Sequence, residues 1–269
     1  MSKRIIAVLA SFSLFIYYFY LLYQRIRPFY LHPGWTTDDA LQQTFPFWEA
    51  VYPDLFKGDL IAEVMKGSNG PVHLRLGMFI TRFTQNPVMT AHILGTIQLF
   101  ITLTALFFAV RRVSSSAAAF FAITWLLHTA TVVQRITGGL ARGWFPAVIA
   151  VFLWLFLSKK HKGVLLFLVL GCLLHPPAAL VCCTTYSLYL LYLFFKERKY
   201  AKKMILQFAF MCPIYLIAVL IFVHRPAYVG NMVSYSQASK MPDFQVYKGR
   251  FPYLPLRTIP QEIKTFAFE

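Results

Sequence analysis

Two adjacent carboxylates, Asp38 and Asp39, are the side chains of this chain that most directly suggest chemistry. They lie in HPGWTTDD (32–39), just after the first long apolar segment, and nine of the ten carboxylates fall outside the positively charged loops. An acid held at a membrane surface can take a proton from an acceptor hydroxyl while its neighbour positions the acceptor or a cation. The same pair could instead cap a helix, since carboxylates interact favourably with free N–H groups and the helix dipole.

Two arginines further along the chain could complete such a site. Arg142 lies in TGGLARGWFP (137–146), where glycines permit a tight turn beside Trp144. Together with Arg135, it could bind a phosphate through paired N–H donors. The alternative is that an arginine next to a tryptophan only anchors the chain at the membrane surface.

Histidines supply further candidates. His175 stands in LHPPAAL (174–180), where two prolines must interrupt a helix. There it could bind a phosphate or sugar hydroxyl, relay a proton, or make only a structural hydrogen bond. The set His73, Arg75 and Arg82 lies late in the same outer loop as the acids, and we expect it to be a solvated approach to the next span.

The elements that must position these residues belong to a membrane protein. The 269 residues are 58% apolar and 17% aromatic, with a mean hydropathy of +0.58, whereas soluble domains are roughly 45–50% apolar. The first apolar run lacks a small-residue cleavage site and is predicted to be an uncleaved signal anchor. The sequence predicts an all-α polytopic membrane protein with seven transmembrane or partial helices, over 5–23, 88–110, 117–133, 144–157, 164–174, 178–195 and 204–223.

Two of these segments, 144–157 and 164–174, are shorter than the roughly 20 residues that cross a bilayer. Short or broken helices persist in a membrane only where protein or a water-filled cavity covers their ends. We therefore expect a cavity that enters the bilayer from one side.

The acids fall in a predicted outer loop, 24–87, that we expect to be structured. Thr36 or Thr37 can cap a helix whose first turn carries the acidic pair, and its mixed polar and aromatic faces suit the membrane interface. A second short helix is expected over 60–65. The simplest division is a membrane domain, 1–223, followed by a Pro-rich outer tail, 224–269.

Charge on the short loops predicts the orientation. Twelve Lys and Arg residues lie on alternate connections, against two on the intervening short loop, so the positive-inside rule places the twelve and the N-terminus in the cytoplasm. Two arginines just after the first span oppose this assignment and are outnumbered. The predicted outer parts are 24–87, 134–143, the break near His175, and 224–269.

Several classes of protein and site are disfavoured. The basic residues that give the chain its net charge of +16 border apolar spans, and no nucleic-acid-binding motif accompanies them. We therefore expect lipid headgroups, and not nucleic acid, as their partner. The four cysteines, Cys172, Cys182, Cys183 and Cys212, have no metal-ligand spacing and are expected to pack inside helices. No Gly-rich phosphate loop is present, which favours a lipid-linked over a nucleotide-linked donor.

The order of these features resembles the polytopic C-type glycosyltransferase fold, in which an N-terminal span precedes an outer loop with an acidic pair, interfacial helices and several further spans. The resemblance covers residues 1–223 and is closest to enzymes that use polyprenyl-phosphate sugars, such as mannosyltransferases. It implies that Asp38 or Asp39 is the base and that the donor is a sugar on a polyprenyl phosphate. The GLARGWFP and LHPPAAL stretches resemble segments of bacterial membrane proteins of this type, which implies the inner membrane.

Members of that family usually continue with more spans, so the resemblance implies a minimal member or one part of a longer protein whose donor site another part or subunit completes. The predicted reaction is glycosyl transfer at the outer face, with Asp38 or Asp39 as base and Arg135, Arg142 and His175 binding the substrate. We expect no cofactor, because an acid pair without a third ligand gives little support to a bound Mg²⁺ or Mn²⁺. The alternatives are a transporter or flippase for a lipid-linked substrate, and a non-catalytic subunit of an envelope complex.

Overall fold

The computed structural model describes residues 3–32, 34–196, 201–223, 237 and 240–242. These residues form helices joined by turns, with no strand among them, which confirms the predicted all-α fold. The chain divides into two units, Met1–Pro226 and Ala227–Glu269. All helices named below belong to the first unit, and the predicted outer tail lies almost wholly outside the described residues.

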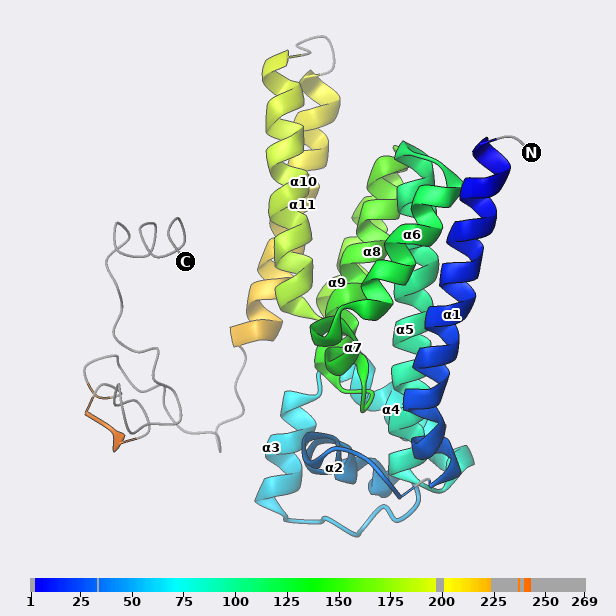
Figure 1. The fold of residues 1–269 in the computed structure, drawn as a ribbon. Helices are drawn as coiled ribbons and strands as arrows, with labels where there is room; N and C mark the ends of the chain where they lie inside the picture. Colours follow the sequence, from blue (N-terminus) through cyan, green and yellow to red (C-terminus); the bar gives the residue numbers. More distant parts are fainter. Residues whose placement is uncertain (1–2, 33, 197–200, 224–236, 238–239, 243–269) are drawn as a thin grey trace. The chain divides into compact units, whose positions relative to one another are not determined.

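Each predicted apolar segment is helical. The helices are α1 (Lys3–Leu31), α5 (Pro87–Val113), α6 (Ser116–His128) with α7 (Ala130–Ile136), α8 (Trp144–Leu157), α9 (His161–Leu174), α10 (Pro176–Lys196) and α11 (Ala201–Val223) (Figure 1). Within the described residues, α1, α5 and α10 are long and apolar enough to cross a membrane, and the bent pair α6–α7 would make a fourth span. The helix α1 is apolar yet largely exposed, as expected of a helix that faces lipid. The chain is therefore an integral membrane protein.

One predicted span is broken. The helices α6 and α7 meet at a 74° bend, so 117–133 is not the continuous helix that its hydropathy predicts. At the break, Thr129 takes an extended conformation, with φ −75° and ψ 99°. Its hydroxyl donates a 3.1 Å hydrogen bond to the Trp125 carbonyl, which satisfies part of the freed helix end.

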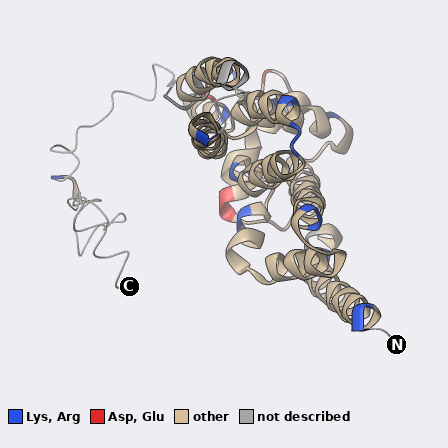
Figure 2. Ribbon diagram, turned by 90° about the horizontal axis from the view of Figure 1, so that it is seen from above, with Lys and Arg blue, Asp and Glu red and all other residues tan. Residues whose placement is uncertain are grey.

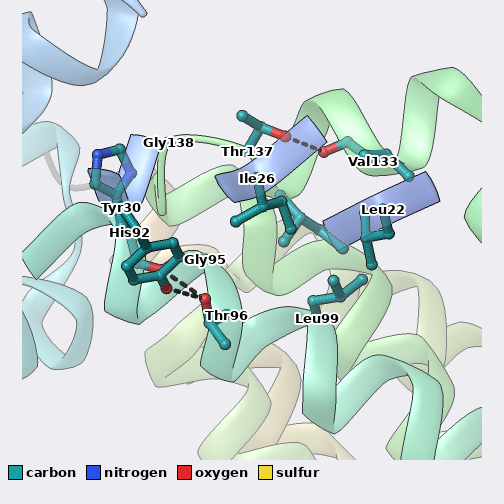
Figure 3. Close-up of a pocket in the computed structure, with 11 residues that line it drawn as sticks. Leu22, Ile26, Tyr30, His92, Gly95, Thr96, Leu99, Val133, Thr137 and Gly138 are labelled. Atoms are coloured by element: carbon teal, nitrogen blue, oxygen red, sulfur yellow. Dashed lines mark hydrogen bonds between the residues drawn. The ribbon is translucent and has the colours of Figure 1, made fainter. Parts of the chain in front are cut away.

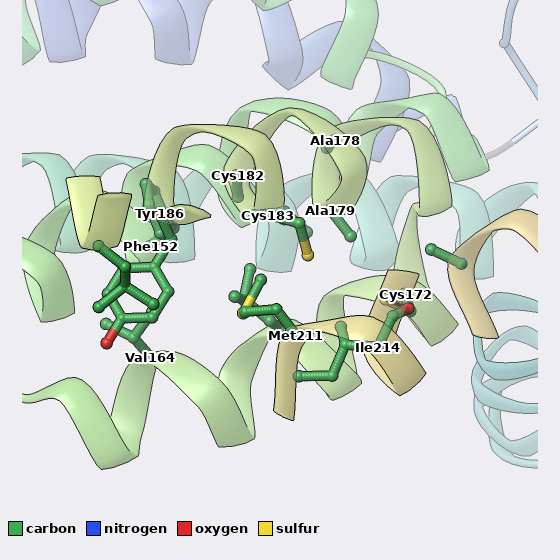
Figure 4. Close-up of a cluster of buried hydrophobic side chains, with 14 residues drawn as sticks. Phe152, Val164, Cys172, Ala178, Ala179, Cys182, Cys183, Tyr186, Met211 and Ile214 are labelled. Atoms are coloured by element: carbon green, nitrogen blue, oxygen red, sulfur yellow. Dashed lines mark hydrogen bonds between the residues drawn. The ribbon is translucent and has the colours of Figure 1, made fainter. Parts of the chain in front are cut away.

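The helices pack around two apolar cores. One core is formed by α1, α5, α6 and α7, and includes Leu22, Leu103 and Ile123. The other is formed by α8 to α11 and is drawn in Figure 4. The extensive contact between α5 and α8 joins the two. Both helices bury alanines, which allow the close approach typical of helices in membranes.

The sequence predicts that all four cysteines pack inside the helical core. Cys172, Cys182 and Cys183 are buried in the α8–α11 core, as predicted. Cys212 is exposed on α11, so the prediction is wrong for that residue. Helical periodicity explains the difference, since consecutive turns of an apolar helix present one face to the core and the opposite face outward.

The segment between α1 and α5 is structured. It contains α2 (Asp38–Thr44), the 3₁₀ helix η1 (Phe45–Ala50), α3 (Leu60–Ser68) and α4 (Pro71–Thr84). The first helix and the short helix over 60–65 confirm the predictions for this loop, whereas α4 was not predicted. Phe47 of η1 is fully buried against Gly77 of α4, where any side chain would collide with the ring. Figure 2 shows how few of the helical residues in this unit are charged.

Candidate functional site

An ion pair joins the acidic pair to the predicted arginine turn. The Nη2 of Arg142 donates a 2.7 Å hydrogen bond to Oδ2 of Asp39. Both side chains are about half exposed, at 46% for Arg142 and 52% for Asp39. The structure therefore brings Asp39 and Arg142, which the sequence predicts to share one site, into direct contact. Solvent screening limits such a pair to roughly 0.2–1 kcal/mol of stability, so its geometry matters more than its strength.

The start of α2 holds Asp39 in place. Thr37 is the N-cap, and its Oγ1 accepts a 3.3 Å hydrogen bond from the backbone N–H of Ala40. The carboxylates are therefore not the capping groups, and they occupy the first helical turn, where negative charge is favourable. Asp38 accepts a 3.1 Å hydrogen bond from Gln42 along its own helix. Of the two acids, Asp39 is the one directed at Arg142.

The turn that carries Arg142 is fixed by close backbone packing on α5. Gly139 has a φ of +60°, and a side chain there would run into the carbonyl of Ala91. Gly143 leaves no room for a side chain beside the Gln98 amide, which donates a 3.0 Å hydrogen bond to the Leu140 carbonyl. The glycines therefore hold the turn against α5, and the 3₁₀ helix η2 (Ala141–Gly143) presents Arg142 at its surface.

Arg135 and His175 form a second group around Phe145. The guanidinium carbon of Arg135 lies 5.9 Å from the centre of the Phe145 ring. That ring meets the His175 ring edge to face at 5.6 Å. Burial lowers the pKa of His175, and the nearby charge of Arg135 lowers it further. The His175 Nδ1 accepts a 3.1 Å hydrogen bond from the N–H of Ala178, so this atom caps α10 as the structural interpretation predicted.

The two groups lie on adjoining backbone. A side-chain carbon placed on Gly143 would lie 3.3 Å from the carbonyl oxygen of Arg135. The end of α7 therefore runs beside the turn that carries Arg142. Within the described part of the chain, neither member of the Asp39–Arg142 pair makes a hydrogen bond to His175. The structure thus pairs Asp39 directly with Arg142. The backbone of Arg135 lies next to the turn that carries Arg142. Asp38 instead contacts Gln42 of its own helix.

A pocket of about 40 Å³ lies between α1, α5 and α7 (Figure 3). Leu22, Ile26 and Leu99 contribute apolar walls. At its polar end, the Tyr30 hydroxyl donates a 3.0 Å hydrogen bond to the His92 carbonyl and shares another with the Thr96 hydroxyl.

This pocket is smaller than the cavity that the short spans led us to expect. A single water needs about 10–15 Å³ on this measure, so the pocket has room for a few waters and not for a lipid-linked sugar. None of the predicted site residues lines it. Gly138 connects it to the acidic helix, because this residue lines the pocket and its backbone packs against Thr37 and Ala40.

A buried pair of aromatic residues supports the arginine turn and was not predicted. His73 is fully buried, and its Nδ1 accepts a 3.0 Å hydrogen bond from the indole N–H of Trp144. Burial lowers the pKa of His73 to about 4, so the ring is neutral at pH 7. The prediction of a solvated segment is therefore wrong for His73. The four-residue spacing of His73, Gly77 and Thr81, which are the buried residues of α4, is the sequence signal that marks this helical face.

Metal ligands and similar proteins give no further assignment. The described residues contain no group of three or more His, Cys, Asp or Glu side chains placed to hold a metal ion. No protein-family model matches the chain, and neither a curated protein nor a solved structure shows a significant match to it.

Proposed function

We propose that this chain takes part in glycosyl transfer from a polyprenyl-phosphate-linked sugar to an acceptor hydroxyl at the outer face of a membrane. The observation that carries the proposal is the half-exposed pair of Asp39 and Arg142. It combines a carboxylate able to accept a proton with a guanidinium able to bind a phosphate. The resemblance of the span order to C-type glycosyltransferases supports the same reaction.

The proposed reaction is a single displacement. The acceptor oxygen forms a bond to the anomeric carbon of the sugar, and the bond from that carbon to the phosphate oxygen breaks. Asp39 receives the proton of the acceptor hydroxyl, and the departing polyprenyl phosphate keeps the electron pair. Arg142, with Arg135 on the adjoining backbone, stabilises the charge that develops on the phosphate.

The remaining predicted residues have supporting roles in this proposal. Asp38 adds negative charge to the first turn of α2 and holds Gln42, so we assign the base to Asp39 alone. His175 keeps Nδ1 on the start of α10, which leaves Nε2 as the atom that would meet a sugar or phosphate oxygen. Asp39 and Arg142 pair with each other and need no metal ion in this scheme.

The proposed setting is a bacterial inner membrane with the N-terminus in the cytoplasm. The basic connections support this orientation through the positive-inside rule. The proposed partners are membrane lipid, the polyprenyl-phosphate sugar, and a further polypeptide segment or subunit that completes the donor site.

The test is transfer by purified protein in proteoliposomes that contain radiolabelled polyprenyl-phosphate sugars, with release of polyprenyl phosphate as the readout. Asp39→Asn should abolish transfer, because an amide cannot accept the proton. Glu49→Gln is the matched control: it removes a carboxylate from an ion pair with Lys66, 2.9 Å away, in the same outer segment. Lys66 keeps Glu63 as a second partner, so the control leaves no isolated charge. Transfer at the wild-type rate by Asp39→Asn would refute the assignment of the base.

A second candidate is a transporter or flippase for a lipid-linked substrate. The 74° break between α6 and α7 favours it, because broken helices frame the binding sites of many transporters. The same proteoliposomes distinguish the two functions. A transporter would move the labelled lipid between leaflets without releasing polyprenyl phosphate. The Asp39→Asn variant would not abolish this movement.

A further inference from the structure

Arg142 already holds an anion, and that anion is the proposed base. The contact between Asp39 Oδ2 and Arg142 Nη2 is 2.7 Å, the length of a strong charge-assisted hydrogen bond. The Oδ2 oxygen of Asp39, which accepts this hydrogen bond from the guanidinium, is poorly placed to accept a proton from an incoming hydroxyl. The base and the phosphate-binding group of the proposed function therefore pair with each other in this structure.

We propose that Asp39 is an internal competitor for the anion site at Arg142, and that binding of a phosphate ester there displaces the carboxylate and frees it to act as the base. This inference rests on the proposed function, whose donor carries such a phosphate. It adds a control step to the site, since the phosphate of the donor switches the base on.

The geometry permits the exchange. Both side chains are about half exposed, so neither must leave a packed core to separate. The α2 backbone is held by Thr37 and does not depend on the ion pair for its cap. Arg142 has five N–H donors, of which Asp39 engages the Nη2 group, so a phosphate can approach the same guanidinium before the carboxylate leaves.

Charge favours the phosphate over the carboxylate. Arg135 lies on adjoining backbone and forms no ion pair within the described part of the chain, where its guanidinium rests over the Phe145 ring. Asp39 pairs only with the positive charge of Arg142 among the residues that the structure describes. A phosphate presents several oxygens, so it can engage more of the Arg142 donors than the single Oδ2 contact of Asp39 does.

The exchange favours an order of binding. Asp39 becomes more available to the acceptor hydroxyl once the phosphate of the donor has reached Arg142. Binding of the donor before deprotonation of the acceptor is therefore the favoured order.

The test measures binding of farnesyl phosphate, a short polyprenyl phosphate, to the full chain in nanodiscs. Asp39→Asn removes the competitor and should tighten binding about 1.4- to fivefold, the range expected from breaking an exposed ion pair. Arg142→Gln should weaken binding. Asp38→Asn removes an equal charge one residue away and should produce only a fraction of the effect, while Glu49→Gln should produce none. Far-UV circular dichroism and size-exclusion chromatography verify that each variant is folded.

Inorganic phosphate serves as the second ligand and identifies the source of the anion. Stronger response to farnesyl phosphate assigns the site to a lipid phosphate, and an equal response assigns it to a free phosphate; tightening by Asp39→Asn supports the exchange in either case. Unchanged or weaker binding by a folded Asp39→Asn variant would overturn it, as would equal tightening by Asp38→Asn.

The outcomes for this inference and for the proposed function are separable. If Asp39→Asn tightens phosphate binding but the wild-type protein transfers no sugar, the exchange stands and glycosyl transfer fails. If the wild-type protein transfers sugar but Asp39→Asn leaves phosphate affinity unchanged, the reaction stands and the exchange fails.

Discussion

Asp39 and Arg142 are 103 positions apart in the sequence and meet in an ion pair of 2.7 Å. Asp39 comes from the first turn of α2, which follows the first apolar helix, and Arg142 comes from the turn that leads into α8. The candidate site therefore depends on tertiary structure, in particular on how the 137–143 turn packs between α2 and α5.

The ion pair should show measurable coupling in a double-mutant cycle. We expect Asp39→Asn and Arg142→Gln together to cost less stability than the sum of the two single changes, by roughly 0.2–1 kcal/mol, because both groups are half exposed. Thermal unfolding in detergent at low salt measures this, and added salt should reduce the coupling. Strictly additive effects at low salt would show that the contact contributes nothing in solution.

Gly139 should tolerate no side chain. Its φ of +60° is unfavourable for other residues, and a methyl group there would collide with the Ala91 carbonyl. We expect Gly139→Ala to lower stability by at least about 2 kcal/mol, from backbone strain and overpacking combined. Gly34→Ala is the matched control, because nothing lies within 4 Å of a side chain at that position and its φ is not positive. Equal melting temperatures for the two variants would contradict the packing of this turn.

The fold was largely predictable because hydropathy reports directly on membrane helices. Every predicted apolar segment is helical, although 117–133 forms the bent pair α6–α7, and Thr37 and the prolines at 176 and 177 marked helix starts. The break at Thr129 was not predictable in the same way, since neither glycine nor proline occurs there and the bend depends on how α7 packs.

The site was predictable only in part. Residue type singled out Asp39 and Arg142, but which of two adjacent acids would face the arginine depended on a helical rotation of about 100° that no local pattern fixes. The structure turns Asp39 to Arg142 and Asp38 to Gln42. His73 was missed because a histidine near arginines suggests a solvated surface, whereas its partner, the Trp144 indole, lies 71 positions away.

His73 should make the fold sensitive to acid. Burial lowers the pKa of this ring from 6.5 to about 4, so the unfolded chain binds a proton more readily than the folded protein does. Its contribution is complete above pH 6.5 and is lost as the pH falls towards 4, by roughly 3 kcal/mol in total. We expect His73→Asn, which keeps an acceptor for the Trp144 N–H and cannot titrate, to flatten the melting temperature profile between these pH values.

The control for this prediction is His32→Asn, which changes an exposed histidine. It should leave the profile as steep as in the wild-type protein. An equally steep profile for His73→Asn would show that other groups set the acid sensitivity.

The orientation of the chain can be tested with single cysteines in a background without the four native ones. Ser68 at the end of α3 and Ser114 after α5 are both exposed, and lie on opposite sides of one span in the proposed topology. A membrane-impermeant thiol reagent on intact cells should label Ser68→Cys, and should label Ser114→Cys only after permeabilisation. The reverse pattern would invert the topology and place the candidate site in the cytoplasm.

The crowded turn beside α5 gives a criterion for finding relatives of this chain. Gly139 is fixed by contact with the α5 backbone, Gly143 by the Gln98 side chain, and Trp144 by a buried hydrogen bond, so substitution at these positions is restricted for reasons independent of activity. Homologous sequences should keep the spacing Gly-x-x-x-Gly-Trp even after the apolar helices around it have diverged. Among them, those that have lost Arg142 but kept this frame would share the ancestry and the architecture without the chemistry.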